Sequence, residues 1–308
     1  MAVHAHLGHD HTHAHPTTAP RMIALALLLT LAFVAAEAIA AWVAHSLALF
    51  SDAAHNLADA AALGLSWYGL SIARKPSNHG MTYGYHRVGI GVAWINGLSL
   101  VALAIWIMWE AAKRLQAPPM PQGPLMIGVA LAAVVVNGVI GWRLHAHSKH
   151  DLNIRSAYLH MIGDAVSALG VAIAGVAIAV TGRAAADPIA SILIAVLILW
   201  SSYRVIRDST TVLLEGTPPG TDMPAVLAAI KAVPGVLNVH DLHVWMVGPG
   251  VVACSCHIVV ADRSAREGQA VLREVVRDIE RRFHITHTTV QVEVEGCAPG
   301  EICGPTDS

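Results

Sequence analysis

The sequence predicts a membrane protein of six transmembrane α-helices followed by a C-terminal cytoplasmic α+β domain with the element order αββαβ. Of its 308 residues, 55% are hydrophobic and only 13% are charged, and the mean hydropathy is +0.55. An average soluble domain is about one quarter charged. Six apolar stretches reach the roughly 20 residues that cross a bilayer. Beyond Arg207 the sequence becomes soluble in character, so the membrane helices are expected before it.

The six expected spans follow these apolar stretches, at residues 22–44, 46–72, 88–112, 124–147, 156–181 and 188–206. Basic residues near the span ends fall unequally on the two sides of the membrane. The richer side contains Arg21, Arg74, Lys75, Arg87, Arg143, Lys149, Arg155, Arg204 and Arg207. The poorer side contains Lys113, Arg114 and Arg183. Because loops rich in Lys and Arg face the cytoplasm, both termini are expected there, in a multi-pass protein of the inner (cytoplasmic) membrane.

The spans divide the chain into a His-rich tail at 1–20, a transmembrane domain at 21–212, a cytoplasmic domain at 213–296 and a C-terminal tail at 297–308. The histidines of the first tail are His4, His6, His9, His11, His13 and His15. This composition predicts a disordered tail that scavenges metal, or a low-complexity tail with no necessary role. The first span lacks a small-residue cleavage site, so we expect a retained helix. The net charge of −2 gives no indication of a nucleic-acid partner.

Two His–Asp pairs with the same spacing of four residues lie inside apolar spans, His55 with Asp59 and His160 with Asp164. An ionisable residue at the bilayer centre costs roughly 2.5 to 3.5 kcal/mol. Residues four apart share one face of a helix, so each pair presents one imidazole and one carboxylate to the same neighbour. Two such helices facing each other supply the four ligands of a tetrahedral zinc site. The alternative, in which each pair only bonds to neighbouring helices, is weakened by the duplication.

The same ligand set predicts exchange of metal for protons. Two carboxylates offset the charge of a divalent cation, whereas an empty ionised site would be unpaired charge in a low dielectric. Metal binding requires neutral His and ionised Asp, so metal and protons compete for the same atoms. Asp52 lies on the same polar stripe and is a candidate for supporting a ligand or lining a water path. Glu37 and Asn56 are expected to form hydrogen bonds between helices.

The cytoplasmic domain is expected to form a helix at 222–233, strands at 236–247 and 251–260, a helix at 265–283 and a last strand at 287–295. The turn Gly248-Pro249-Gly250 makes the first two strands a hairpin. One sheet backed by helices on one face is the expected architecture. A domain of this size has a limited core, so docking with a second copy would help it. Its candidate metal ligands are His240, His243, His257, His284, His287 and Glu293.

The four cysteines, Cys254, Cys256, Cys297 and Cys303, all lie in the expected cytoplasmic part. Thiols normally stay reduced in that compartment, so disulfides are not expected. None of the four has the Cys-x-x-Cys spacing of a structural zinc site.

Several stretches of the chain resemble the cation diffusion facilitators, specifically the zinc-transporting branch. They are SLALFSDAAHNLADA at 46–60, YGYHRV at 83–88, YLHMIGDAVSALGV at 158–171, DPIASILIAVLIL at 187–199, and LLEGTP followed by VHDLHVW. The resemblance implies a homodimer that exchanges cytoplasmic Zn2+ for protons by alternating access, with cytoplasmic domains of metallochaperone-like fold. Carried over, the transport site is His55, Asp59, His160 and Asp164.

The resemblance also implies regulatory metal at the cytoplasmic interface. His257 and Glu293 match positions that bind it in relatives, and His240 is a third candidate. Thr286 stands where many relatives have His, and His284 or His287 is a candidate substitute. A second site that some relatives hold after the second span is not expected, because Asn78, Met81 and Tyr85 stand at its positions.

Two other classes of function remain as alternatives to a transporter. An intramembrane metal-dependent hydrolase would need an open coordination position, which four protein ligands fill. A membrane-anchored metal sensor or buffer would leave the polar stripes inside the spans without a use. The ligand types do not decide among Zn2+, Cd2+, Co2+ and Ni2+, because geometry decides. No organic cofactor is expected.

Overall fold

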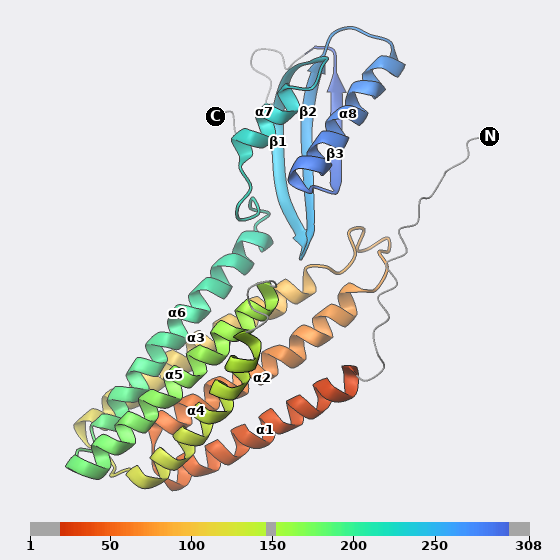
Figure 1. Cartoon of the computed structure of the whole chain (residues 1–308). Coiled ribbons are helices and arrows are strands. Elements are labelled where there is room, and N and C mark those ends of the chain that lie inside the picture. The colour runs from red at the N-terminus through yellow and green to blue at the C-terminus, as the bar shows by residue number, and fades with distance from the viewer. Residues whose placement is uncertain (1–18, 146–151, 296–308) are drawn as a thin grey trace. The chain divides into compact units, whose positions relative to one another are not determined.

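The computed structural model describes residues 19–145 and 152–295. The predicted His-rich tail up to residue 18 and the C-terminal tail lie outside the described residues. Six long helices fill the first part of the chain: α1 (Ala19–Val43), α2 (Leu47–Ala73), α3 (Val88–Gln116), α4 (Gly123–His145), α5 (Leu152–Thr181) and α6 (Ala186–Leu213). Figure 1 labels each of these long helices. The predicted helical membrane domain is therefore confirmed in its helices.

Among the described residues, four helical segments are long and apolar enough to cross a membrane: α3, α4, α6 and the part of α5 from Ala157. A shorter apolar helix runs over Thr30–Val43 in α1. In α2 the polar stripe lowers the hydropathy. The helix α6 continues from the apolar stretch to Leu213, several residues beyond the predicted end at 206. Hydropathy marks where a helix is apolar, whereas helical hydrogen bonding continues into its polar end.

The described residues fall into two compact units. One unit contains α1, α2 up to Ala60, α3 from Ile107, α4, α5 and the start of α6 to Ile194. Within it, α4 and α5 pack most closely, and small residues allow this approach. A Cβ added at Gly123 would lie 2.7 Å from the Gly175 carbonyl oxygen and 3.1 Å from the Ala179 Cβ. Small residues at such interfaces let helix backbones approach each other in membranes.

A buried carboxylate at the start of α6 accepts hydrogen bonds from the start of α2. Asp187 accepts hydrogen bonds from Ser46 Oγ at 2.6 Å, Leu47 N at 2.8 Å and Ala48 N at 3.1 Å. Ser46 Oγ in turn accepts from Leu49 N at 3.1 Å. The first backbone N–H groups of a helix have no partner within the helix, and an anion there is stabilised. Asp187 therefore fixes where α2 begins, two turns before His55.

The second unit contains the rest of α2, α3 and α6 together with the C-terminal domain. Trp94 Nε1 donates to Thr210 Oγ1 at 3.0 Å, which joins α3 to α6. A Cβ at Gly97 would lie 2.7 Å from Ile206 Cγ1, so these helices also meet at a glycine.

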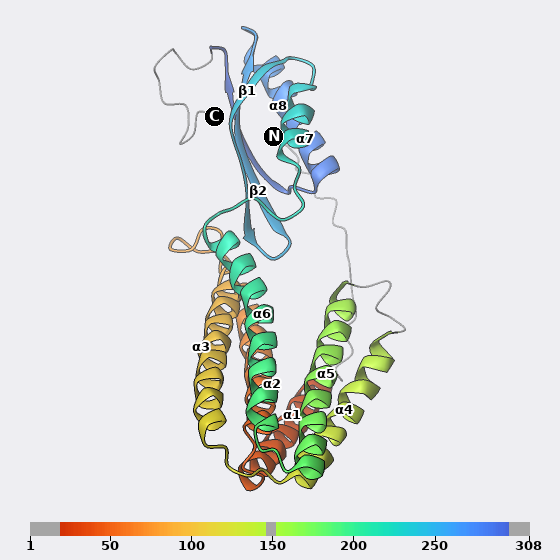
Figure 2. The same ribbon diagram turned by 90° about the vertical axis from the view of Figure 1, so that its left-hand side faces the viewer.

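The C-terminal domain has the predicted order: α7 (Met223–Lys231), β1 (Val236–Gly248), β2 (Val251–Val260), α8 (Ala265–Phe283) and β3 (His287–Glu293). The sheet order is β1-β2-β3, with β1 and β2 antiparallel and β2 and β3 parallel. Figure 2 shows α7 and α8 on the same face of the sheet. The αββαβ prediction and the hairpin at Gly248-Pro249-Gly250 are confirmed.

The core of this domain lies between the sheet and its two helices. Alternate residues of β2, Cys254, Cys256 and Ile258, are buried there against Val275 and Ile279 of α8. Cys254 and Cys256 are free thiols, and their mutual hydrogen bond lowers the pKa of Cys254 and raises that of Cys256. Because side chains alternate along a strand, His257 lies on the opposite face of the sheet from these cysteines.

Candidate metal centre

The two His–Asp pairs meet between α2 and α5. His55 Nε2 lies 3.4 Å from Asp59 Oδ2 on its own helix and 3.7 Å from Asp164 Oδ1 on α5. His160 Nε2 lies 3.5 Å from Asp59 Oδ2 on α2 and 3.6 Å from Asp164 Oδ2 on its own helix. Each imidazole therefore contacts a carboxylate of both helices.

These separations suit a single metal ion. A tetrahedral zinc centre with bonds near ~2.0 Å places its ligand atoms about 3.3 Å apart. Ligand atoms of His55, Asp59 and Asp164 all lie within 4.8 Å of one another. His160 is not in that three-residue group, although its Nε2 contacts both aspartates, and its side chain is more open, 45% exposed against 14% for His55. The two imidazole rings meet edge to face with centroids 6.4 Å apart.

Two polar atoms of this centre are left without a hydrogen bond. Asp59 Oδ2 and His55 Nδ1 are buried and have no hydrogen-bond partner among the described residues. Burying a carboxylate oxygen or an imidazole nitrogen without a partner is costly. A divalent cation at the centre of the four side chains would bind the carboxylate oxygen and offset the charge of both aspartates.

The neighbouring polar residues form hydrogen bonds with other helices. Asp52 lies three residues before His55 and accepts a hydrogen bond from Ser167 Oγ at 2.7 Å. This hydrogen bond joins α2 to α5 beside the centre. Asn56 Nδ2 donates to Glu37 Oε2 at 3.1 Å, which joins α2 to α1. The predicted interhelical hydrogen bonding of Glu37 and Asn56 is confirmed.

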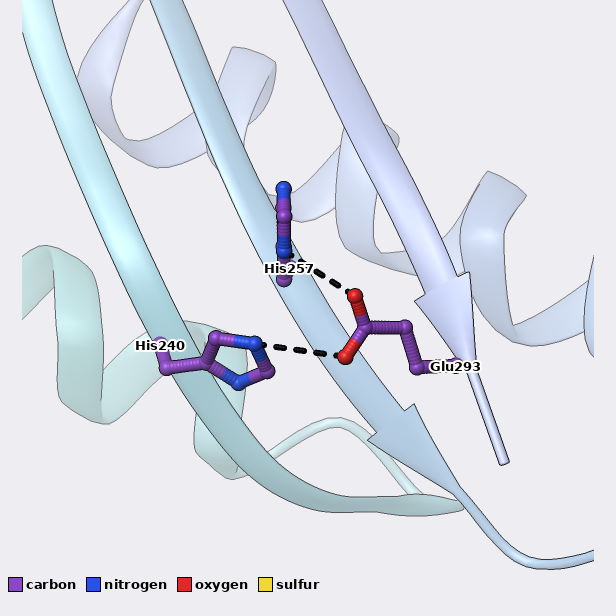
Figure 3. Close-up of side chains that lie close together, drawn as sticks. All are labelled: His240, His257 and Glu293. Atoms are coloured by element: carbon purple, nitrogen blue, oxygen red, sulfur yellow. Dashed lines mark ion pairs between the residues drawn. The ribbon is translucent and has the colours of Figure 1, made fainter. Parts of the chain in front are cut away.

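A second group of candidate ligands lies on the open face of the C-terminal sheet, shown in Figure 3. His257 Nδ1 lies 3.0 Å from Glu293 Oε1, and His240 Nε2 lies 3.2 Å from Glu293 Oε2. The rings of His240 and His257 are 5.1 Å apart and edge to face. Ligand atoms of all three side chains lie within 4.8 Å of one another. His240 lies on β1, His257 on β2 and Glu293 on β3. His240 and His257 are directly paired in the ladder between β1 and β2.

Asp241 is a member of this region that sequence reasoning missed. It has a positive φ of 52° inside a register shift between His240 and His243. Its Oδ1 lies 2.8 Å from His243 Nε2, and its Oδ2 lies 3.8 Å from His257 Nε2. A bulge of this kind re-aims side chains. His243, a candidate ligand in the sequence, is therefore bonded to Asp241 and stands apart from the three-residue group.

The structure does not bring His284 or His287 to this group. His284 is the left-handed C-cap of α8, and its backbone N–H donates to the Glu280 carbonyl. His287 begins β3 opposite Ala253, whereas Glu293 ends it opposite Val259. Six residues of strand separate them by roughly 20 Å. Neither histidine therefore lies beside His257 and Glu293, where a substitute for a histidine at Thr286 was expected. Both are close to Thr286 in sequence, but they lie far from Glu293, at the other end of β3.

Two family models match the chain. One is described as the cation efflux transmembrane domain and matches residues 23–214. The other is described as the cation efflux protein, cytoplasmic domain, and matches residues 218–295.

Curated relatives are similar over nearly the whole chain. A cadmium, cobalt and zinc/H(+)-K(+) antiporter of Bacillus subtilis is 36% identical, with 94% of this chain and 93% of that protein covered. The metal cation efflux system protein CzcD of Cupriavidus metallidurans is 35% identical, with 94% and 92% covered. The zinc transporter ZitB of Escherichia coli is 34% identical, with 94% and 93% covered.

Proposed function

The chain belongs to the cation efflux family, and we propose from this premise that it carries Zn2+ out of the cytoplasm in exchange for protons. It is a transporter of divalent metal cations and not an enzyme. The observation that carries the assignment of the site is the convergence of His55, Asp59, His160 and Asp164, whose four His–Asp contacts are all 3.4 to 3.7 Å.

The chemistry of the site follows from its four side chains. Two neutral imidazoles and two ionised carboxylates bind a dication to give a formally neutral complex inside the membrane. When the metal leaves, the carboxylates lose their counter-charge and take up protons. Because metal and protons compete for the same atoms, movement of one in one direction drives movement of the other in the opposite direction.

We also propose the arrangement in which this exchange takes place. Both termini and the cytoplasmic domain lie on the cytoplasmic side of the inner membrane, as the basic residues of the loops predict. All six helices cross the bilayer as one domain at 21–212, followed by the cytoplasmic domain at 213–296. Two copies form a homodimer that alternates between inward and outward access. The relatives named for cadmium and cobalt as well as zinc support a range of divalent substrates, and Ni2+ remains an expected one.

The cytoplasmic group of His240, His257 and Glu293 is proposed as a separate metal site with a regulatory role. Two imidazoles and one carboxylate leave a position for a further ligand. The group lies on the face of the sheet that the two helices leave uncovered, which is the face available to a second copy. Metal bound there would stabilise the pairing of two cytoplasmic domains.

Sealed vesicles provide the test of this function. In inverted vesicles with an acidic interior, Zn2+ is expected to accumulate above its external concentration, because protons leaving the vesicle drive metal in. A protonophore that collapses the pH gradient is expected to reduce uptake to passive equilibration. The measurement is Zn2+ inside the vesicles over time, against vesicles without the protein.

The same assay separates the alternatives. A metal sensor or buffer would bind zinc in proportion to protein and not accumulate it, and an intramembrane hydrolase would move no metal at all. Uphill accumulation that continues unchanged after the gradient has collapsed would disprove proton coupling.

A further inference from the structure

Four polar side chains form a second buried group beside the metal centre. They come from three helices: Glu37 of α1, Asp52 and Asn56 of α2, and Ser167 of α5. Asn56 donates to Glu37 Oε2 at 3.1 Å, and Ser167 donates to Asp52 Oδ1 at 2.7 Å. The carboxyl groups of Glu37 and Asp52 lie within hydrogen-bond reach of each other. We call Glu37 and Asp52 the carboxyl pair.

The carboxyl pair is more deeply buried than the metal ligands. Glu37 is 1% exposed and Asp52 is 3% exposed, against 7% for Asp164. Glu37 Oε1 is buried and accepts no hydrogen bond from any of the described residues. An unpartnered carboxylate oxygen at this depth requires a ligand that brings a positive charge or a hydrogen.

The groups that face the pair include one that can carry a positive charge. On α2 the nearest ionisable residue is His55, which can be protonated, and on α5 it is Asp164, which adds negative charge. The helix α4, which packs against α1, has no acidic or basic residue between Gly123 and Trp142. Two carboxylates in contact repel each other in such surroundings, which favours the binding of one shared proton.

The neutral members of the group indicate which ligand fits. The Asn56 amide and the Ser167 hydroxyl both point hydrogens at the carboxylates. A metal or alkali cation would need their oxygen lone pairs instead. A proton bound at Glu37 Oε1 would remove the negative charge from that unpartnered oxygen, so the group is suited to bind a proton.

The carboxyl pair lies between the metal ligands and the connection from α1 to α2, which indicates the side from which a proton reaches it. Asp52 lies one turn from His55 toward the start of α2 at Leu47, and Glu37 lies near the end of α1 at Val43. Both ends meet at the short connection between α1 and α2. With the N-terminus in the cytoplasm, as proposed, this connection faces out of the cytoplasm. A proton entering from that side reaches the carboxyl pair before it reaches the metal ligands.

We propose that Glu37 and Asp52 form a proton-binding site, separate from the metal ligands, that carries one of the counter-transported protons. This inference rests on the proposed proton-coupled transport. The pair takes one proton from the side to which metal leaves and releases one to the side from which metal enters. The pair alternates between a state in which both carboxylates are ionised and a state in which they share one proton. No other reactant is needed.

The test is the number of protons exchanged for each Zn2+ in proteoliposomes, measured with pH-sensitive and zinc-sensitive dyes. Glu37→Gln has the same shape and stays neutral, so the count is expected to fall by one while Zn2+ still binds with wild-type stoichiometry. Glu37→Asp retains a carboxyl group and is expected to restore the count. Asp52→Asn is expected to behave as Glu37→Gln does, which keeps the test open if one variant fails to fold.

A matched control comes from the same helix. Ser51 is buried and its hydroxyl donates to the Leu47 carbonyl of its own helix, so Ser51→Ala is expected to exchange the wild-type number of protons. A wild-type count in Glu37→Gln would overturn the inference, and so would loss of Zn2+ binding in folded Glu37→Gln. A changed dependence on potassium with an unchanged proton count would assign the pair to an alkali cation and overturn it as well. If the wild-type protein exchanges no protons, the proposed function fails first.

Discussion

Asp164→Ala is expected to reduce zinc transport to the level of vesicles without the protein. Asp164 is the most buried of the four metal ligands, and its two oxygens contact His55 on α2 and His160 on α5. Alanine removes a ligand and one of the two charges that offset the dication. The remaining set of two imidazoles and one carboxylate would leave a charged complex in a low-dielectric site, which is unfavourable. Zinc uptake into inverted vesicles under an inward-acidic gradient measures the effect.

The same variant is expected to reach the membrane in wild-type amounts, because removing a buried carboxylate does not lengthen or interrupt an apolar helix. Asp208→Ala provides the matched control, since Asp208 is exposed near the end of α6. Its transport is expected to equal that of the wild type. Wild-type zinc flux in Asp164→Ala vesicles would exclude this residue from the transport site.

Asp187→Ala is expected to have the largest effect on stability. The Asp187 carboxylate is the acceptor for three donors at the start of α2. Alanine leaves the Ser46 hydroxyl and the Leu47 and Ala48 N–H groups buried without that acceptor. Each buried donor left unpaired costs about 1 to 3 kcal/mol, so we expect the loss of all three bonds to lower the free energy of unfolding by at least about 3 kcal/mol. Thermal unfolding of the purified protein in detergent measures the loss.

Asp187→Asn separates the hydrogen bonds from the charge. The amide retains one acceptor oxygen and is expected to give a midpoint between those of the wild type and Asp187→Ala. An unchanged unfolding midpoint in Asp187→Ala would mean that the start of α2 does not depend on this carboxylate.

Most of the architecture could be predicted from periodicity and hydropathy. The apolar stretches located six helices, and alternation with turn residues located the three strands of the C-terminal domain. The pairing of His55 with Asp59 followed from the geometry of one helix, because residues four apart share a face. These features depend on local sequence alone. Helix ends were less accurate, as the extension of α6 to Leu213 shows.

Features that depend on contacts between distant segments could not be predicted. Nothing in the sequence assigns Asp187 to the start of α2, which lies 140 residues earlier. The contact of Glu37 with Asp52 depends on how α1 packs against α2. At the cytoplasmic site, the register of three strands brings Glu293 to His257, and the same register takes His287 away from them. A bulge at Asp241 shifts which histidines share a face, and no turn residue marks it in advance.

The most direct test of the central claim is a zinc titration of the purified full-length protein by calorimetry at fixed pH. The His257→Ala protein removes the proposed cytoplasmic site, and beside any zinc bound by the histidines of residues 4–15 we expect one binding event of one Zn2+ per chain in the transmembrane centre. Adding Asp59→Ala or Asp164→Ala, one from each helix, is expected to abolish that same binding event. If either double variant still binds one Zn2+ with the affinity of His257→Ala, the two His–Asp pairs do not share a single ion and the account is contradicted.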